Sequence, residues 1–124
     1  MKVGDVMTRD VVTASEDASV AEVAELMQEH NISSVPVLDR AGKLTGIVSE
    51  GDLVRELLPQ YGEMIQEDRY RVDPEYPEQR AAELRHRPVK GIMTRPVITT
   101  TEATALLRAA AMLQLKRIKR LDVV

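Results

Sequence analysis

Cysteine, phenylalanine and tryptophan are absent from the 124-residue sequence, and tyrosine occurs only three times. The absence of cysteine excludes disulfides, thiolate metal ligands and cysteine nucleophiles. The lack of large aromatic side chains means that the core must be aliphatic. Hydrophobic residues nevertheless make up 44% of the chain, which is enough for the core of one domain or of two small, closely packed halves.

A surplus of positive charge and a long apolar run are also missing. The net charge of -3 and the pI near 5.4 argue against a protein that mainly binds the nucleic-acid backbone. No stretch approaches the ~20 apolar residues of a membrane span, and the first residues lack the apolar segment of a signal peptide. We therefore expect a cytoplasmic protein without a membrane partner, for which the charge disfavours a nucleic acid as the main partner.

One segment of the sequence is repeated at a constant offset. Val6-Met7-Thr8-Arg9 recurs as Ile92-Met93-Thr94-Arg95, 86 residues later, and with this offset residues 3–38 and 89–124 share 11 identities in 36 positions. A shared period of this kind indicates two copies of one structural unit. We expect a first motif at 1–58, a polar, proline-containing connector at 59–88 with short helices near 63–67 and 78–85, and a second motif at 89–124.

The first copy has the pattern of a β-α-β-β-α unit. The β-branched run 11–13 predicts a strand, and Ser19 with Glu22 predicts a capping box for a helix that stops near His30 and Asn31. Strands are predicted at 34–38 and 43–48, joined by a turn at 39–42, and a last helix ends before Pro59. Val124 aligns with Leu38, so the second copy lacks this last strand and helix. We expect that a longer natural chain, or else a partner chain, supplies them.

The segment Gly46-Ile47-Val48-Ser49-Glu50-Gly51-Asp52-Leu53 allows two interpretations. Ser49 is a preferred N-cap residue and an acid in the first turn favours the helix dipole, which together stabilise a helix start by about 1 kcal/mol. Alternatively, the segment is half of a ligand site: if Asp52 contacts a nucleotide, it should accept hydrogen bonds from ribose hydroxyls, whereas Ser49 and the free N–H groups suit a phosphate. Both roles can coexist, and the pattern alone leaves them open.

The first copy resembles the cystathionine-β-synthase-type (CBS) domain. The features that carry this resemblance are V-x-x-V-M-T, the amphipathic helix, the run Ile32-Ser33-Ser34-Val35-Pro36-Val37 and then GIVSEGDL. Two copies resemble a tandem CBS pair, or Bateman module, with an incomplete second motif. The resemblance implies an α+β fold with two pseudo-two-fold-related motifs, each a three-stranded sheet packed on two helices. It also implies a non-catalytic regulatory module that often forms a homodimer, needs no cofactor and binds AMP, ADP, ATP or S-adenosylmethionine in a cleft, with AMP or ATP favoured here.

The resemblance also assigns roles to individual residues. Threonine hydroxyls face the cleft, small apolar residues flank the adenine while serving as core, and cations just before the second strand reach phosphates. Met7 and Met93 are expected to be buried anchors, and Asp122 stands where Pro36 stands in the first copy. The predicted ligand-binding residues are Ser49, Asp52, Thr8, Thr13, Val35, Pro36, Thr94, Val97, Lys119 and Arg120.

Two rival functions stay open at this point. One is an interaction or dimerisation module without a ligand, favoured by the incomplete second copy and by Asp122. The other is nucleic-acid binding through the basic cluster 116–120, which predicts steep salt dependence. We expect no metal site at His30 or His86, which lack an acid-rich ligand set, and no enzyme activity, because no nucleophile and base are paired.

Overall fold

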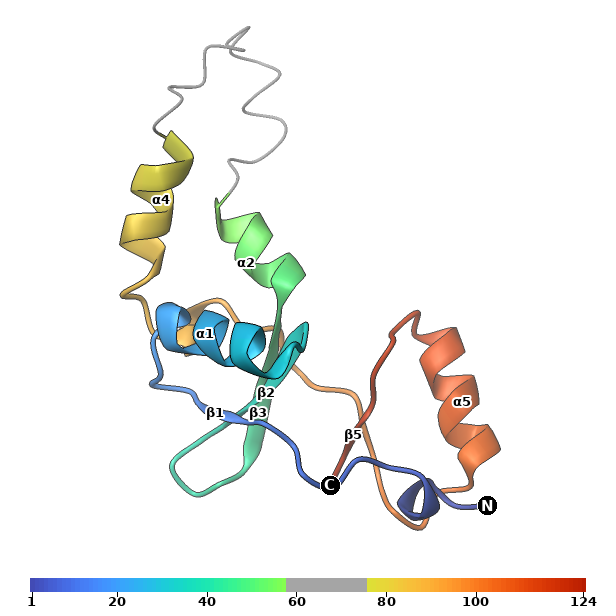
Figure 1. The fold of residues 1–124 in the computed structure, drawn as a ribbon. Coiled ribbons are helices and arrows are strands. Elements are labelled where there is room, and N and C mark those ends of the chain that lie inside the picture. Colours follow the sequence, from blue (N-terminus) through green and yellow to red (C-terminus); the bar gives the residue numbers. More distant parts are fainter. Residues whose placement is uncertain (58–75) are drawn as a thin grey trace, which may run out of the picture. The chain divides into compact units, whose positions relative to one another are not determined.

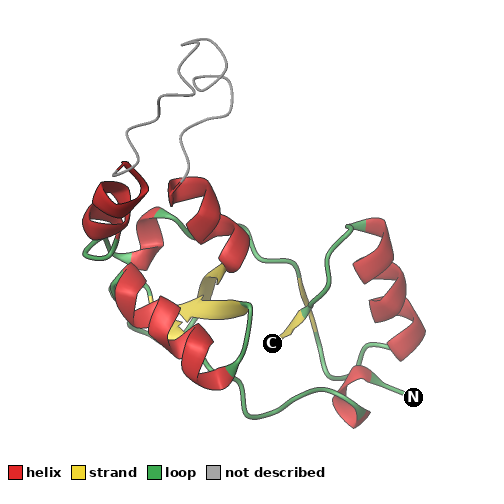
Figure 2. Cartoon of the chain, turned by 45° about the horizontal axis from the view of Figure 1, so that its top comes forward, coloured by secondary structure: helices red, strands yellow, loops and turns green. Residues whose placement is uncertain are grey.

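The computed structural model describes residues 1–57 and 76–124. Its contacts divide the chain into two compact units, Val12–Arg95 and Met1–Val11 together with Pro96–Val124. Each unit combines helices with a small β-sheet (Figures 1 and 2), which confirms the predicted α+β class. Within the described residues, no helix has both the length and the apolar character needed to cross a membrane.

The larger unit contains the β-α-β-β-α order predicted for the first copy. Its elements are β1 (Ala14–Ser15), α1 (Val20–His30), β2 (Ser34–Leu38), β3 (Leu44–Ser49), α2 (Glu50–Leu57), α4 (Tyr76–Leu84) and the 3-10 turn η2 (Val89–Gly91). β2 is the central strand, parallel to β1 and antiparallel to β3. The helix predicted at 78–85 is α4, whereas the one predicted at 63–67 lies outside the described residues.

Both ends of α1 follow from its sequence. The Ser19 hydroxyl accepts a hydrogen bond from the Glu22 N–H at 3.1 Å, which satisfies one of the free donors of the first turn. At the other end Asn31 takes a left-handed conformation with φ 51°, which asparagine tolerates better than most residues. The predicted start and end of this helix are confirmed.

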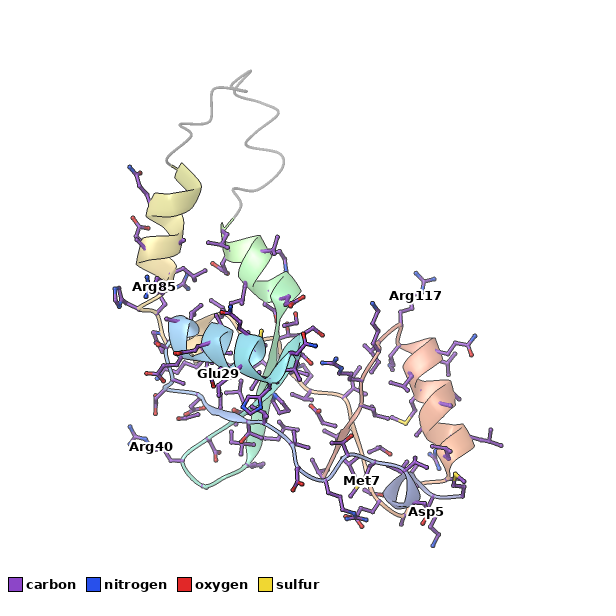
Figure 3. All side chains as sticks on the ribbon, viewed as in Figure 1. Asp5, Met7, Glu29, Arg40, Arg85 and Arg117 are labelled. Atoms are coloured by element: carbon purple, nitrogen blue, oxygen red, sulfur yellow. The ribbon has the colours of Figure 1, made fainter. Side chains whose placement is uncertain are left out.

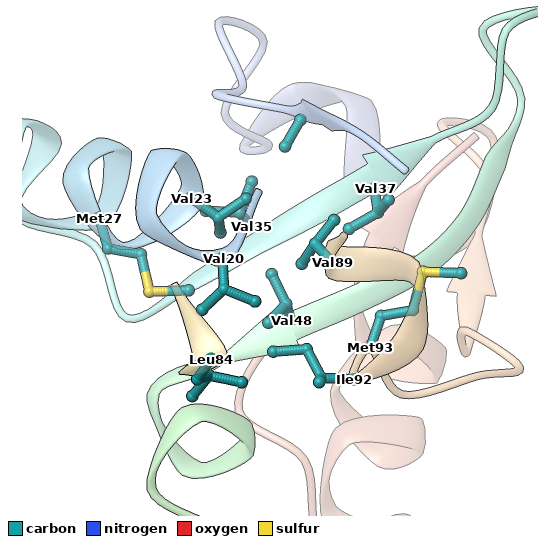
Figure 4. Close-up of a cluster of buried hydrophobic side chains, with 11 residues drawn as sticks. Val20, Val23, Met27, Val35, Val37, Val48, Leu84, Val89, Ile92 and Met93 are labelled. Atoms are coloured by element: carbon teal, nitrogen blue, oxygen red, sulfur yellow. The ribbon is translucent and has the colours of Figure 1, made fainter. Parts of the chain in front are cut away.

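The core of the larger unit lies between α1 and the sheet (Figure 4). Side chains alternate along β2, so that Val35 and Val37 point into the core and Pro36 points to the opposite face. Val23 of α1 and Val48 of β3 join them, and all four valines are fully buried. The core is therefore aliphatic, as the composition requires.

The first strand lies later in the sequence than predicted. The β-branched run 11–13 precedes the observed strand β1, in which Ala14 pairs with Val37 and Ser15 with Leu38. Backbone pairing with β2 decides which residues form the strand, and it outweighs the side-chain preference of the preceding run. Val11 is exposed instead.

The turn between β2 and β3 is the predicted one. The Asp39 carboxylate accepts from the N–H groups of Ala41 and Lys43, both at 2.9 Å, and Gly42 adopts a φ of 80° that a side chain would disfavour.

The smaller unit holds the second copy's elements together with the first residues of the chain. They are the 3-10 turn η1 (Val3–Asp5), β4 (Thr99–Thr100), α5 (Leu106–Leu115) and β5 (Asp122–Val123). β4 and β5 are parallel and pair at Thr99 with Asp122 and at Thr100 with Val123. This arrangement matches β1 and β2 of the first copy.

The segment before each copy's first strand packs against the helix start of the other copy. In the smaller unit the backbone bonds are Val3 N–H to Thr104 O (2.9 Å), Gly4 N–H to Glu102 O (3.0 Å) and Leu106 N–H to Met1 O (2.9 Å). In the larger unit they are Val89 N–H to Ala18 O (2.8 Å), Lys90 N–H to Glu16 O (3.1 Å) and Val20 N–H to Arg87 O (2.9 Å). Corresponding residues differ by 86 throughout, so the repeat extends to individual hydrogen bonds.

A close contact fixes the segment before Thr94 onto the sheet. Met93 is buried, as predicted, and its side chain fills the space in front of Gly46 in β3. A Cβ atom at position 46 would lie 2.4 Å from the Met93 sulfur. A side chain at this position would therefore force the methionine to move from its place against the strand.

We predict that Gly46→Ala destabilises the larger unit by about 1–3 kcal/mol, because the added methyl group overpacks the contact with Met93. Chemical denaturation measures the loss. Gly51→Ala is the matched control: its Cβ would meet only the Ser49 hydroxyl at 3.6 Å, and alanine favours the helix. Equal stability of the two variants would contradict the proposed packing role of Gly46.

Candidate functional site

The start of α2 is a reciprocal capping box formed by Ser49 and Asp52. The Ser49 hydroxyl accepts from the Asp52 N–H at 3.3 Å, and the Asp52 carboxylate accepts from the Ser49 N–H at 2.8 Å and from its hydroxyl at 3.1 Å. Two donors of the first turn are thereby satisfied. The capping interpretation of the Ser-x-x-Asp segment is therefore correct.

Thr94 joins this box from the second copy. Its backbone pairs with Ile47 of β3 through two hydrogen bonds, of 3.0 and 2.8 Å, which form an antiparallel bridge. The Thr94 hydroxyl donates to Oδ1 of Asp52 at 3.0 Å. The structure thus brings together three of the predicted site residues, Ser49, Asp52 and Thr94.

Arg55 completes the cluster, although it was not among the predicted site residues. Its guanidinium forms an ion pair and hydrogen bond with Oδ1 of Asp52, three residues earlier on the same helix. Asp52 is 4% exposed, whereas the Arg55 side chain is 73% exposed. The signal in the sequence is the spacing of opposite charges by three residues, which places both side chains on one helix face.

The other predicted site residues of the larger unit lie on different surfaces. Thr13 is exposed and immediately precedes β1, and Pro36 is half-buried on the sheet face opposite the core. Val35 is fully buried against α1. Its predicted role in the core is confirmed, but its predicted contact with a ligand stays a prediction.

The remaining predicted residues belong to the smaller unit. Thr8 follows η1 and is exposed, Val97 is half-buried before β4, and Lys119 and Arg120 precede β5 and are exposed. Arg117, at the end of α5 (Figure 3), takes a φ of 54° at the position that matches Asn31. Met7 is only half-buried, so it is a weaker anchor than predicted.

Asp122 carries the one clear electrostatic anomaly among the described residues of the smaller unit. Its Oδ2 atom is buried and has no hydrogen-bond partner among those residues. Burial disfavours the charged form and raises the pKa of the Asp122 carboxyl above its ordinary value. The residue therefore costs stability in its ionised form.

The described residues hold no group of three or more histidine and acidic side chains that could bind a metal ion.

Comparisons with known proteins bear on the family and the fold of this chain. The family model of the CBS domain matches residues 3–59. An uncharacterized protein from Methanopyrus kandleri is 31% identical over all of this chain and 53% of its own length. The crystal structure of the CBS domain of a CBS domain-containing membrane protein from Sphaerobacter thermophilus is 30% identical, with a TM-score of 0.78. The match includes the whole of this chain and 77% of the other chain.

The chain belongs to the CBS domain family. CBS domain pairs are regulatory modules, and two similar structures contain adenosine compounds. The CBS domain pair of protein MJ0100, in complex with 5'-methylthioadenosine and S-adenosyl-L-methionine, is 25% identical with a TM-score of 0.71, over 100% of this chain and 80% of that one. CBSX2 in complex with AMP is 26% identical with a TM-score of 0.73, over 99% and 81%.

The chain spans about a third to a half of the first curated relatives that it matches, 34% of one and 53% of the next. These relatives therefore contain further sequence beyond the segment that matches this chain.

We predict that Asp122→Asn is more stable than the native protein at pH 7 and that the difference disappears near pH 4. Because the folded-state pKa is raised, the native protein loses stability as the pH rises from the unfolded pKa through the folded one. Asparagine does not ionise and removes this loss. Urea denaturation at several pH values measures it. A difference that is constant with pH would show that Asp122 ionises without cost.

Proposed function

We propose that this chain is a regulatory module that binds an adenosine-containing ligand through the Ser49, Asp52 and Thr94 cluster. The observation that carries the proposal is the buried carboxylate of Asp52, held by donors from two separate segments of the chain. Such a carboxylate is an acceptor that suits the two hydroxyls of a ribose. A helix start built only as a cap does not require the threonine from residue 94.

The similar structures support this choice of ligand, because 5'-methylthioadenosine, S-adenosylmethionine and AMP share the adenosine moiety. On the basis of the family resemblance, Thr13 and Pro36 are proposed as further ligand contacts in the larger unit, and Thr8, Val97, Lys119 and Arg120 are proposed as ligand-binding residues of the smaller unit. Regulation would follow if the ligand favours one conformation of the module over another, since a ligand shifts an equilibrium only by its differential affinity.

We predict that calorimetric titration with AMP, ATP, S-adenosylmethionine and 5'-methylthioadenosine gives saturable binding of at least one of them. Asp52→Asn should weaken that binding by about tenfold to a hundredfold, because one of the two accepting oxygens becomes an NH2 donor that cannot accept from the second ribose hydroxyl. Thr94→Val, which keeps the side-chain shape, should weaken it as well. No binding of any of the four at millimolar concentration would rule out the proposal.

A matched control separates binding from folding. Ser19→Ala removes the cap of α1, whose geometry resembles that of Ser49, and should lower stability by about 0.5–2 kcal/mol. Because Ser19 caps α1 and has no bond to Asp52, the affinity for the ligand should stay unchanged. Equal losses of affinity in Ser19→Ala and Asp52→Asn would mean that the effect is one of stability.

We also propose that the module forms a homodimer through α5. Leu107 and Leu115 lie two turns apart on this helix with 86% and 81% of their surface exposed, and Ala111 lies between them on the same face. Large exposed apolar side chains on one helix face are typical of an interaction surface. The corresponding positions of α1 are Ala21, Glu25 and Glu29, so the feature belongs to the second copy alone.

We predict that the native protein sediments as a dimer and that the double variant Leu107→Ser/Leu115→Ser sediments as a monomer, since the exposed apolar surface is lost. Sedimentation velocity at several concentrations measures this. Glu25→Ser/Glu29→Ser on α1 is the matched control and should remain dimeric. If the native protein remains a monomer over a roughly hundredfold range of protein concentration, the proposed dimer is wrong.

A further inference from the structure

The carboxylate of Asp52 is fully occupied before any ligand arrives. A carboxylate offers about four acceptor positions, and four donors from the part of the chain that the structure describes reach Asp52: the N–H and the hydroxyl of Ser49, the hydroxyl of Thr94 and the guanidinium of Arg55. A ribose can therefore bind this carboxylate only by displacing one of these donors.

The four donors differ in how firmly they are held. The Ser49 N–H and hydroxyl belong to the cap of α2. Thr94 is fixed by its backbone bridge to Ile47. Arg55 is held through a long side chain that is 73% exposed, and its other bond is to the Gly51 carbonyl at 3.5 Å. The guanidinium of Arg55 is thus the donor that leaves with the least disturbance of the fold.

Displacement of Arg55 has an electrostatic consequence. A neutral ribose satisfies the hydrogen-bonding capacity of Asp52 but leaves its charge without the cation that balances it, and it leaves the guanidinium without an anion. A ligand with a phosphate group supplies a new partner for the guanidinium, which binds phosphate oxygens through paired N–H donors. The same phosphate would be repelled by Asp52 if Arg55 did not stand beside it.

We propose that Arg55 is a specificity-determining residue: it competes with the ligand for Asp52 and, once displaced, pairs with the ligand's phosphate. The module would thereby select nucleoside phosphates over neutral or cationic nucleosides. This inference rests on the proposed binding of adenosine-containing ligands at Asp52. Arg55 lies outside the Ser-x-x-Asp segment. Its proposed role favours AMP, which has a phosphate, over 5'-methylthioadenosine and S-adenosylmethionine, which have none.

The test compares AMP with adenosine in the native protein and in Arg55→Met, which keeps a long side chain without the charge. For adenosine, the variant should bind several-fold more tightly, because no cation has to leave Asp52. The variant should bind AMP more weakly. The dissociation constant for adenosine divided by that for AMP should therefore fall by about tenfold or more. Isothermal titration at low ionic strength gives both constants.

Two control variants make the result specific. Arg95→Met removes a cation next to Thr94 whose guanidinium bonds to the Lys90 carbonyl at 3.3 Å, and it should leave the ratio unchanged. Lys119→Gln removes one of the cations that the sequence predicts to meet phosphates. If this variant lowers the ratio and Arg55→Met does not, the phosphate is bound by Lys119 and the proposal for Arg55 is wrong.

The outcomes for Arg55 and for the proposed function are distinguishable. If the native protein binds AMP and Arg55→Met binds AMP and adenosine with unchanged constants, the Arg55 pair is a surface ion pair without a role in selection, and the proposed function stands. If neither protein binds any adenosine compound, the proposed function itself fails. Circular dichroism of each variant confirms that the helices are retained before the constants are compared.

Discussion

The antiparallel bridge between Ile47 and Thr94 is the interaction on which the candidate site depends. Two backbone hydrogen bonds attach the segment that leads into the second copy to the outer edge of β3. β3 is therefore paired on both sides, with β2 on one and residue 94 on the other. The bridge holds Met93 against Gly46 and the Thr94 hydroxyl against Asp52, so that packing and polar contacts of the site share one anchor.

An exchange of leading segments explains why the repeats do not coincide with the compact units. The leading segment of each copy binds to the start of the other copy's helix. The backbone hydrogen bonds of these two contacts occur at equivalent positions 86 residues apart. A carboxylate in one copy can then accept a hydrogen bond from a hydroxyl of the other copy, as Asp52 does from Thr94. Such a site depends on both copies, and this fits a module in which the arrangement of two motifs is the regulated property.

The sequence predicted the local parts of the site and missed the non-local ones. The Ser49 and Asp52 cap could be predicted because both residues lie within one helical turn, where spacing determines contact. Thr94 was included through the repeat and the family resemblance, but its bond to Asp52 spans 42 residues and no local pattern encodes it. The strand predicted at 11–13 was misplaced for the same reason, because its partner β2 sets its position. Arg55 lies within reach of local reasoning, through its spacing from Asp52.

A ligand site built from a helix cap carries a thermodynamic limit. If a ribose binds at Asp52 as proposed, the gain is the difference between the new hydrogen bonds and those that Arg55 already makes, rather than the full strength of either. The net affinity from this part of the site should therefore be modest, and contacts elsewhere on the ligand must supply the rest. A carboxylate that is satisfied in both states also keeps α2 capped whether or not the ligand is present. The proposed exchange of Arg55 for a ribose would thus change the charge pairing at the helix start while the fold remains intact, which is the kind of small, reversible difference that a regulatory module requires.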